Sequence, residues 1–421
     1  MRVDRYEILE HLNSGDSARH VKRSDIVYKH MRDPALLRYY YKIKMQPFTS
    51  RMELVGSSPT DLFIGRYGYP KVFIGPLVPP EFGDTSVLGT PERWRNMNIE
   101  QIVEMRSKLV RGVHLTSVKS VETGKIEEFV RDLALAERPA EAEVSFASRP
   151  VARMAMRDEV QPFGPSAEMK AFELYNVKAD TKIESKYSDI DAKATESMKE
   201  LYNRGVPVSK IQRGLSAGLF GMKNDRKFVP TRWSITAVDD TLSKANLAIV
   251  KGYDPVDAIY AYSNTALDNR WLIFFIPGNW QYESVEAWYP NTIWNENGKD
   301  VSIFGSYENY NGRKHYAEIG GCYYSGRLAV TEAMLSLQKQ AMALILREVH
   351  EGYLMPVGVW NVREHVRETL ETAPTILHSV RDMFEFVKTR FEIGTKDWIK
   401  NSVMLTELLK QKRLLEYMGR R

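Results

Sequence analysis

The chain has 421 residues, a formal net charge of +5 and 43% hydrophobic residues, a composition typical of one large folded domain or two ordinary ones. These values exclude wholesale disorder and fibrous repeats. The single cysteine, Cys322, excludes an intramolecular disulfide and a zinc site built on several thiolates. The apolar run Trp271–Ile276 is far shorter than the roughly twenty residues of a spanning helix, so we expect no membrane segment and a cytoplasmic location.

Basic residues gather at the two ends of the sequence. Residues 1–50 hold ten Lys/Arg and six Asp/Glu, and residues 396–421 hold seven and three. Basic ends suit a polyanion because each cation that meets a phosphate releases a counterion, but solvated termini have the same composition. We therefore divide the chain into a basic N-terminal segment, 1–50, a core, 51–395, and a basic C-terminal segment, 396–421.

The first part of the core mixes strand and helix signals. Two short β-rich runs on either side of Arg66–Pro70 predict a hairpin, since glycine and proline gather between them. Apolar spacing predicts a helix over Ile99–Val110. Residues 136–150 are rich in alanine, glutamate and proline. We interpret them as a connector, either between two domains or within one.

Two consecutive helices are predicted next, the first ended by Gly205 and the second begun at Pro207. Their outline is that of a helix-turn-helix, whose second helix would enter the major groove of DNA. Its side chains suited to bases or phosphates are Lys210, Gln212 and Arg213. A helical hairpin that simply packs on the core explains the same pattern.

Strands and helices alternate irregularly in the rest of the core. Strands are predicted at Trp271–Ile276, Val285–Trp288, Ala343–Arg347 and Val357–Trp360, and helices at Arg327–Gln340, Arg363–Leu370 and Thr395–Tyr417. Because regular βαβ alternation is missing, we predict an α+β fold with a mixed sheet, as one large domain or two closely packed ones.

One polar segment, Pro230 to Asp240, contains two adjacent acids. Asp239 and Asp240 are suited to holding a divalent metal in phosphodiester chemistry. The alternative is that they form the acidic first turn of a helix. Three basic residues near glycine- or proline-rich stretches are candidates for phosphate contact: Arg66, Lys71 and Arg232.

The densest polar cluster lies between residues 312 and 324. Arg313 and Lys314 are candidates for phosphate binding, and His315 beside them is a candidate general acid or base. Glu318 would orient that histidine. A tight turn with exposed charges is the alternative interpretation of the same residues.

The end of the chain has the spacing of a short interaction motif. A polar anchor is followed by a three-pronged hydrophobic plug on one short helical turn, and the residues are Gln411, Leu414, Tyr417 and Met418. This spacing resembles the PCNA-interacting peptide that docks on sliding clamps, although strong forms of it end in two aromatic residues. The alternative is an amphipathic terminal helix that packs on its own body.

Several of these segments together resemble the archaeal Nre family of DNA-repair proteins, of the NreA type. The matching stretches are Gly56–Pro59, Gly65–Val72, Gly75–Pro80, Pro230–Asp240, Gly312–Tyr324 and Met355–Trp360. The resemblance implies a role in repairing damaged DNA, beside nucleotide-excision repair proteins and against cross-linking agents. It also implies PCNA clamp binding through the C-terminal motif.

One departure from the family pattern concerns the N-terminus. Members of the family often carry a cysteine-based zinc finger there, but residues 1–50 contain no cysteine, so we expect no such metal site. DNA contact by this segment would then fall to Arg19, Lys22, Arg23 and Lys29.

Three functions stay open at this point. The first is a clamp-tethered repair factor that binds damaged DNA. The second is a nuclease that uses a divalent metal with some of Asp239, Asp240, His315 and Glu318. The third is a non-catalytic scaffold that joins the clamp to other repair proteins.

Overall fold

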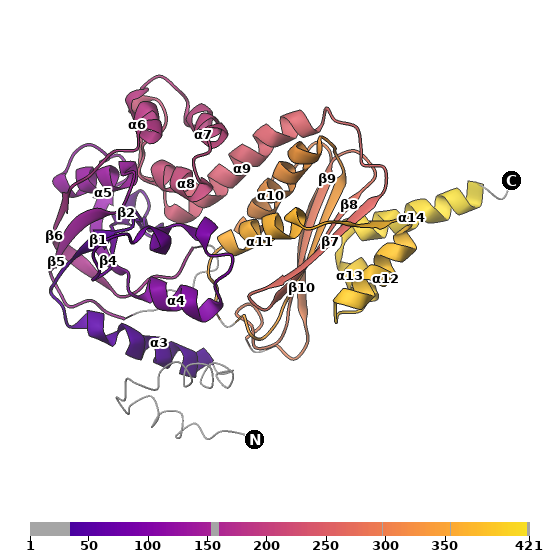
Figure 1. Ribbon diagram of the computed structural model, residues 1–421, viewed down its shortest axis with the longest axis horizontal. Coiled ribbons are helices and arrows are strands. Elements are labelled where there is room, and N and C mark those ends of the chain that lie inside the picture. Colours follow the sequence, from indigo (N-terminus) through magenta and orange to yellow (C-terminus); the bar gives the residue numbers. More distant parts are fainter. Residues whose placement is uncertain (1–33, 153–159, 297, 354, 419–421) are drawn as a thin grey trace.

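The computed structural model describes residues 34–152, 160–296, 298–353 and 355–418, apart from the side chains of 34–40 and 411–418. Figure 1 shows two lobes, each built on a mixed sheet of six strands with helices packed around it. The predicted α+β fold is confirmed. Within the described ranges, every helix is too short or too polar to cross a lipid bilayer.

The first lobe contains a sheet in the order β1-β5-β6-β4-β2, with β3 paired to β4. Its strands are β1 (Glu53–Ser58), β2 (Lys71–Ile74), β3 (Leu77–Val78), β4 (Val110–Ser117), β5 (Ala140–Phe146) and β6 (Ser166–Tyr175). The helices of this lobe are α3 (Pro34–Thr49), α4 (Ile99–Ser107), α5 (Lys125–Leu135), α6 (Thr181–Ser188), α7 (Ala194–Asn203) and α8 (Val208–Ser216). Helices α5, α7 and α8 share one apolar core with the sheet.

The second lobe contains a sheet in the order β10-β9-β11-β8-β7-β12, in which β11 runs parallel to β9 and antiparallel to β8. Its strands are β7 (Ile259–Ala266), β8 (Asn269–Ile276), β9 (Gln281–Trp288), β10 (Ser302–Glu308), β11 (Met342–Val349) and β12 (Thr375–Leu377). Its helices are α10 (Gly321–Leu337), α11 (Trp360–Glu371), α12 (Val380–Arg390), α13 (Thr395–Asn401) and α14 (Val403–Met418).

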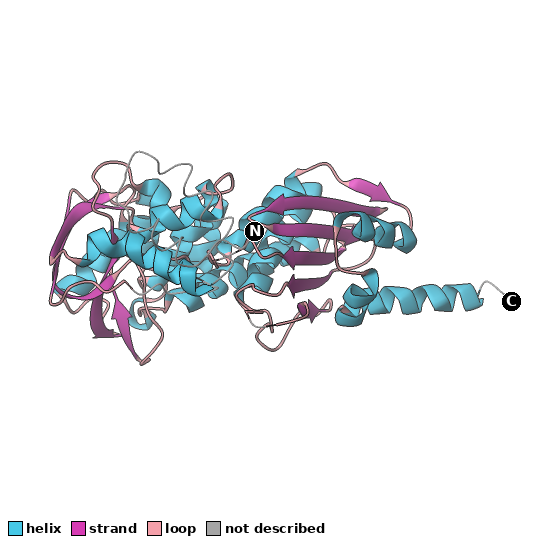
Figure 2. Ribbon diagram, turned by 90° about the horizontal axis from the view of Figure 1, so that it is seen from below, coloured by secondary structure: helices cyan, strands magenta, loops and turns pink. Residues whose placement is uncertain are grey.

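The sequence of strand β8 is a continuous apolar run because both faces of the strand are buried. Trp271 and Ile273 belong to the core shared with α10 and α11. Leu272 and Phe274 belong to the opposite core, shared with α12 and α13. Since the sheet is covered on both faces, as Figure 2 shows, every side chain of the run is buried.

Helix α9 (Thr231–Val250) joins the two lobes. Val238 and Leu242 are buried in the core of the first lobe. Leu247 and Val250, near the other end of the helix, are buried in a core of the second. The two lobes therefore share one helix, and side chains on its outer face lie where the lobes meet.

Residues 136–150, expected to form a connector, contain the inner strand β5. This strand pairs with β1 on one side and β6 on the other. Its buried positions alternate, and they are Ala140, Ala142, Val144 and Phe146. Small alanines fill half of these positions, which hid the strand period in the sequence. The segment is a strand rather than a connector.

Two other predicted elements need correction. Val357–Trp360 is a turn leading into α11 rather than a strand, because Gly358 has φ +98° and its carbonyl accepts a hydrogen bond from the Asn361 amide. Helix α4 ends at Ser107, and Val110 already belongs to β4.

The predicted helix Thr395–Tyr417 is two helices that meet at Ser402. Glu283, a buried carboxylate on β9, accepts hydrogen bonds from the Ser402 hydroxyl (2.6 Å) and from the amides of Val403 and Met404 (2.8 Å each). An acidic group at a helix N-terminus is favourable because the first amides lack partners within the helix. Glu283 therefore fixes the start of α14, whose other end extends away from the body in both views (Figures 1 and 2).

Candidate nucleic-acid interface

An open groove of about 470 Å³ lies where the two lobes meet. Its lining residues are Arg66, Arg232, Trp233, Thr236, Ala237, Asp240, Tyr316 and Tyr324. They come from the loop before β2, from the first half of α9, and from α10 with the loop that precedes it. Three stretches far apart in the sequence therefore meet at one surface.

The groove floor is one face of α9. Arg232, Trp233, Thr236 and Asp240 recur at the spacing of a single helix face, whereas Ser234, Ile235, Val238 and Asp239 point inward and are buried. Successive residues of a helix are about 100° apart, so the adjacent acids Asp239 and Asp240 have different surroundings.

The loop that carries Arg66 is attached directly to the start of α9. The amide of Thr231 donates to the carbonyl of Ile64 (3.0 Å), and the Thr231 hydroxyl accepts from the Ile64 amide (2.9 Å). The chain turns back here as predicted, since the Gly65 amide bonds the Phe73 carbonyl (2.8 Å), although only the second of the two runs, β2, is a strand. Arg66 is thereby held beside the first turn of α9, with its guanidinium 5.3 Å from the centre of the Tyr67 ring.

The loop that carries Tyr316 is held in shape by Arg313. The Arg313 guanidinium donates from Nη1 to the carbonyl of Tyr307 (2.7 Å) and from Nη2 to both carboxylate oxygens of Glu318 (2.7 and 2.8 Å). Arg313 is mostly buried, at 13% side-chain exposure. Its hydrogen bonds favour a role in shaping the loop over the predicted contact with phosphate.

The two candidate catalytic residues of this loop have different surroundings. Slight burial raises the pKa of Glu318, but the hydrogen bond from Ser306 and the Arg313 guanidinium outweigh it and lower that pKa to about 2. A carboxylate so acidic is a weak base. His315 and Lys314 are exposed and are not among the residues that line the groove.

Two exposed aromatic rings line the groove. Trp233 is 43% exposed and Tyr316 is 54% exposed, although both are large rings that usually find apolar cover. Tyr69 lies with its ring centre 5.1 Å from that of Trp233, and Tyr324 lies 5.4 Å from Tyr316. Solvent-facing rings beside arginines are the combination that binds unpaired nucleic acid, because bases stack on rings and cations attract phosphates.

Asp240, the acid in the groove, is held by two cations. One carboxylate oxygen accepts from Arg327, and the other accepts from Lys244 (2.7 Å). Arg327 is buried and also pairs with Glu308 (2.8 Å). Asp240 is thus a fixed hydrogen-bond acceptor in the groove rather than a helix cap.

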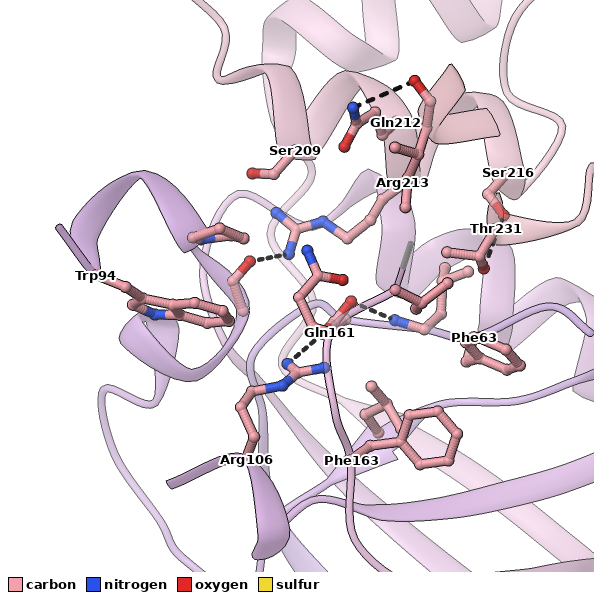
Figure 3. Close-up of a pocket in the computed structure, with 17 residues that line it drawn as sticks. Phe63, Trp94, Arg106, Gln161, Phe163, Ser209, Gln212, Arg213, Ser216 and Thr231 are labelled. Atoms are coloured by element: carbon pink, nitrogen blue, oxygen red, sulfur yellow. Dashed lines mark hydrogen bonds and ion pairs between the residues drawn. The ribbon is translucent and has the colours of Figure 1, made fainter. Parts of the chain in front are cut away.

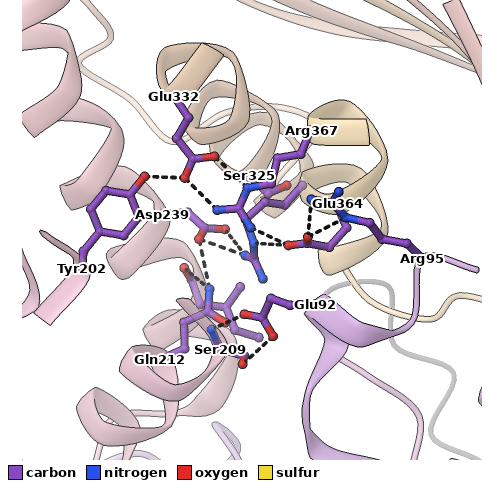
Figure 4. A network of polar contacts seen from close by, with 12 residues as sticks. Glu92, Arg95, Tyr202, Ser209, Gln212, Asp239, Ser325, Glu332, Glu364 and Arg367 are labelled. Carbon is purple, nitrogen blue, oxygen red and sulfur yellow. Dashed lines mark hydrogen bonds and ion pairs between the residues drawn. The ribbon is translucent and has the colours of Figure 1, made fainter. Parts of the chain in front are cut away.

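Asp239 belongs to a buried polar network on the other face of α9 (Figure 4). Its carboxylate accepts from Arg363 (3.0 and 3.1 Å) and from Gln212 (3.0 Å). Burial raises the pKa of Asp239 to about 6, although the guanidiniums of Arg363 and Arg367 lower it. Across the described residues, no three His, Cys, Asp or Glu side chains group to hold a metal ion. Asp239 lies in this buried network and Asp240 in the groove, so the two candidate acids do not converge on one ion.

The predicted recognition helix, α8, is packed inward. Lys210 pairs with Asp180 (2.6 Å), and Arg213 donates to the carbonyl of Gly89 (2.7 Å). Figure 3 shows Arg213, Arg106 and Gln161 around a cavity of about 30 Å³, room for one or two water molecules. These contacts favour the alternative of a packed helical hairpin over insertion into DNA.

The remaining predicted site residues lie apart from the groove or outside the described set. Lys71 is exposed at the start of β2 and does not line the groove. The side chains of Gln411, Leu414, Tyr417 and Met418 lie outside the described residues, although α14 includes their backbone. The basic residues Arg19, Lys22, Arg23 and Lys29 also lie outside them.

Sequence reasoning identified the cations of the groove but missed its rings. Trp233, Tyr316 and Tyr324 all fall within stretches singled out for their polar residues. The signal that was available is the spacing of Arg232, Trp233, Thr236 and Asp240, which places a large ring on a polar helix face.

Comparison with known proteins identifies the family. The model of "Archaeal Nre, N-terminal" matches residues 30–295, and that of "Archaeal Nre, C-terminal" matches residues 308–417. A solved structure of the Thermus thermophilus gyrase B ATPase domain, matched over 75% of this chain and 79% of that one, has a TM-score of 0.13 and 10% identity, too low to indicate a shared fold.

Three relatives named as DNA repair proteins match most of the chain. "DNA repair protein NreB" of Archaeoglobus fulgidus is 40% identical over 87% of this chain and 92% of its own length. "DNA repair protein NreA" of the same organism is 33% identical (86% and 90%), and that of Haloferax volcanii is 34% identical (79% and 83%). The predicted resemblance is confirmed, and the chain belongs to the archaeal Nre family.

Proposed function

We propose that this protein acts in DNA repair, binding DNA at the groove between its lobes while a C-terminal peptide tethers it to the PCNA sliding clamp. The relatives that match most of the chain are named DNA repair proteins, which supports the repair role. Excision-repair proteins are further proposed partners, as the family resemblance implies.

The observation that carries the DNA contact is the convergence of Arg66 and Arg232 with exposed rings in one groove. Both arginines lie next to the N-terminal end of α9, where the helix dipole adds to their positive potential. In the described part of the chain, no carboxylate forms an ion pair with Arg66. Its charge is therefore available to a phosphate, and such contacts give salt-dependent affinity.

The test is the affinity of the purified protein for a labelled oligonucleotide at several salt concentrations. We expect Arg66→Ala to weaken binding and to reduce the slope of log affinity against log salt by about one. Lys119→Ala, which removes a cation outside the groove, is the control and should leave the slope unchanged. Equal slopes for the wild type and Arg66→Ala would contradict the proposed contact.

The clamp tether is supported by how α14 is anchored. Met404 and Leu405, at its start, are buried against the second lobe, and Leu408 packs partly against the same core. The motif begins three residues after Leu408, on the part of α14 whose backbone extends away from the body (Figures 1 and 2). This course of the backbone and the spacing of Gln411, Leu414, Tyr417 and Met418 support the proposed tether.

The tether is tested by calorimetry with the purified clamp. Leu414→Ala combined with Tyr417→Ala should abolish binding, since the plug supplies most of the buried apolar area, while DNA affinity stays at the wild-type value. Clamp binding in a protein without DNA affinity would favour the scaffold function. Unchanged clamp affinity in the double variant would reject the motif.

A further inference from the structure

The groove contains a feature that phosphate binding alone does not use. Trp233 lies on the floor between Arg232 and Asp240, so cationic, aromatic and acidic groups follow one another along α9. Asp240 is eight positions after Arg232, so the two residues are about 12 Å apart along the helix axis. The two ends of the groove therefore differ, with arginine guanidiniums at one end and, at the other, the Asp240 carboxylate, whose charge is balanced by Lys244 and Arg327.

This order of charges distinguishes a nucleobase from a phosphate. A phosphate is attracted to the end near Arg66 and Arg232, whereas the Asp240 carboxylate is an acceptor and offers no hydrogen-bond donor to a phosphate oxygen. A base is neutral, and cytosine and adenine present an exocyclic amino group that a carboxylate accepts. Asp240 keeps acceptor capacity, because each of its oxygens has two lone pairs and is bonded once, by Arg327 or by Lys244.

The shape of the groove suits a single base. Its volume of about 470 Å³ lies within the range of roughly 300–1,000 Å³ found for small-ligand sites. The hairpin loop of Arg66 and the loop of Tyr316 both line the groove together with the α9 face. A base in a duplex stays stacked inside the helix, whereas an unpaired or extruded base can enter such a recess.

We propose that the groove receives an unpaired nucleobase of DNA, stacked on Trp233, with Arg66 and Arg232 contacting the adjacent phosphates and Asp240 accepting from the base amino group. This inference rests on the proposed function, since it names the DNA structure that the same groove selects. Unpaired bases are a common feature of damaged DNA, where stacking or pairing has been lost.

The test compares three DNAs by fluorescence anisotropy: a duplex, the same duplex with one bulged cytosine, and one with a bulged thymine. The wild-type protein should bind the cytosine bulge about tenfold more tightly than the duplex, because stacking of one base on a ring has that order of effect. It should bind the thymine bulge more weakly than the cytosine bulge, since thymine has no amino group for Asp240.

Substitutions of Trp233 then test whether its ring causes the preference for bulged DNA over duplex DNA. Trp233→Ala should bring the ratio of bulged-DNA affinity to duplex affinity close to one, and Trp233→Phe should restore most of the preference. Trp233 is 43% exposed, so neither change removes a buried side chain. The matched control is Trp294→Ala, which removes a ring that is 53% exposed outside the groove and should change nothing.

The outcomes separate this inference from the function on which it rests. Equal affinity for duplex and bulged DNA, or a preference that survives Trp233→Ala, would overturn the base site and leave DNA binding standing. Absence of affinity for all three DNAs would overturn the proposed function and the base site together.

Discussion

The two faces of α9 have the same kinds of residue in different roles. On the inner face, Asp239 accepts from Arg363 and Gln212 in a network that crosses both lobes (Figure 4). On the outer face, Asp240 and Arg232 line an open groove beside Trp233. Whether a charged side chain of α9 is buried therefore decides whether it bonds to residues of both lobes or faces the open groove.

The largest expected effect comes from the inner face. Arg363→Ala leaves the carboxylate of Asp239 buried with only Gln212 as a partner, and we expect a loss of about 3–5 kcal/mol in the free energy of unfolding. Denaturant unfolding measures it.

The comparison variant changes Asp240, which follows Asp239 on α9 but lies on the outer face. Asp240→Asn should cost less than about 1 kcal/mol, because Asp240 is partly exposed and Arg327 keeps its pairing with Glu308. Equal losses in the two variants would contradict the distinction between the faces.

A smaller effect on stability is expected in the loop that carries Arg313 and Tyr316, beside the outer face of α9. Arg313→Ala should cost about 1–2 kcal/mol of stability, because its hydrogen bonds to Glu318 and to the Tyr307 carbonyl are lost. DNA affinity should fall with it, as Tyr316 loses its support.

Arg313→Lys decides between a shaping role and a phosphate contact. Lysine keeps the charge but has a single nitrogen, so it cannot hold the Glu318 carboxylate with one nitrogen and the Tyr307 carbonyl with another, as Arg313 does. We expect it to resemble Arg313→Ala in both stability and DNA affinity. DNA affinity at the wild-type level would instead show that Arg313 contacts phosphate.

The smallest expected effect is a pH dependence at the same loop. The pKa of Glu318 is lowered to about 2, so its ion pair stabilises the fold above the ordinary carboxyl pKa and is lost as the pH falls toward 2. Glu318→Gln should therefore lower the melting temperature at pH 7 by an amount that shrinks below pH 4.5. Because the side chain is largely exposed, the energy involved is below about 1 kcal/mol. A difference that is constant from pH 3 to pH 7 would contradict the assigned ion pair.

The elements predicted correctly from the sequence are those whose hydrophobic pattern follows directly from which of their side chains are buried. The run Trp271–Ile276 is a strand buried on both faces, and its uninterrupted apolar sequence indicates that directly. Strand β5 was missed because Ala140 and Ala142, small residues in buried positions, resemble a polar loop in composition. The break at Ser402 was missed because its cause, Glu283, is distant in the sequence.

The candidate site was predictable only in part. Arg66, Arg232 and Asp240 were identified from polar segments, but their meeting depends on the Ile64–Thr231 hydrogen bonds and on α9 joining the lobes. Whether Arg313 contacts a ligand or shapes a loop depends on Glu318 and the Tyr307 carbonyl, which are brought near it by folding. Composition cannot distinguish these roles, since both need the same side chain.

The most direct test of the account is to locate the DNA on the protein. A single-stranded oligonucleotide with one 5-iodouracil forms photochemical cross-links to aromatic side chains in contact with it, and mass spectrometry of the peptides identifies them. We predict cross-links at Trp233 and Tyr316, the exposed rings that line the groove. Cross-links confined to other surfaces, such as the one around Trp294, would contradict the assignment of the outer face of α9 to DNA.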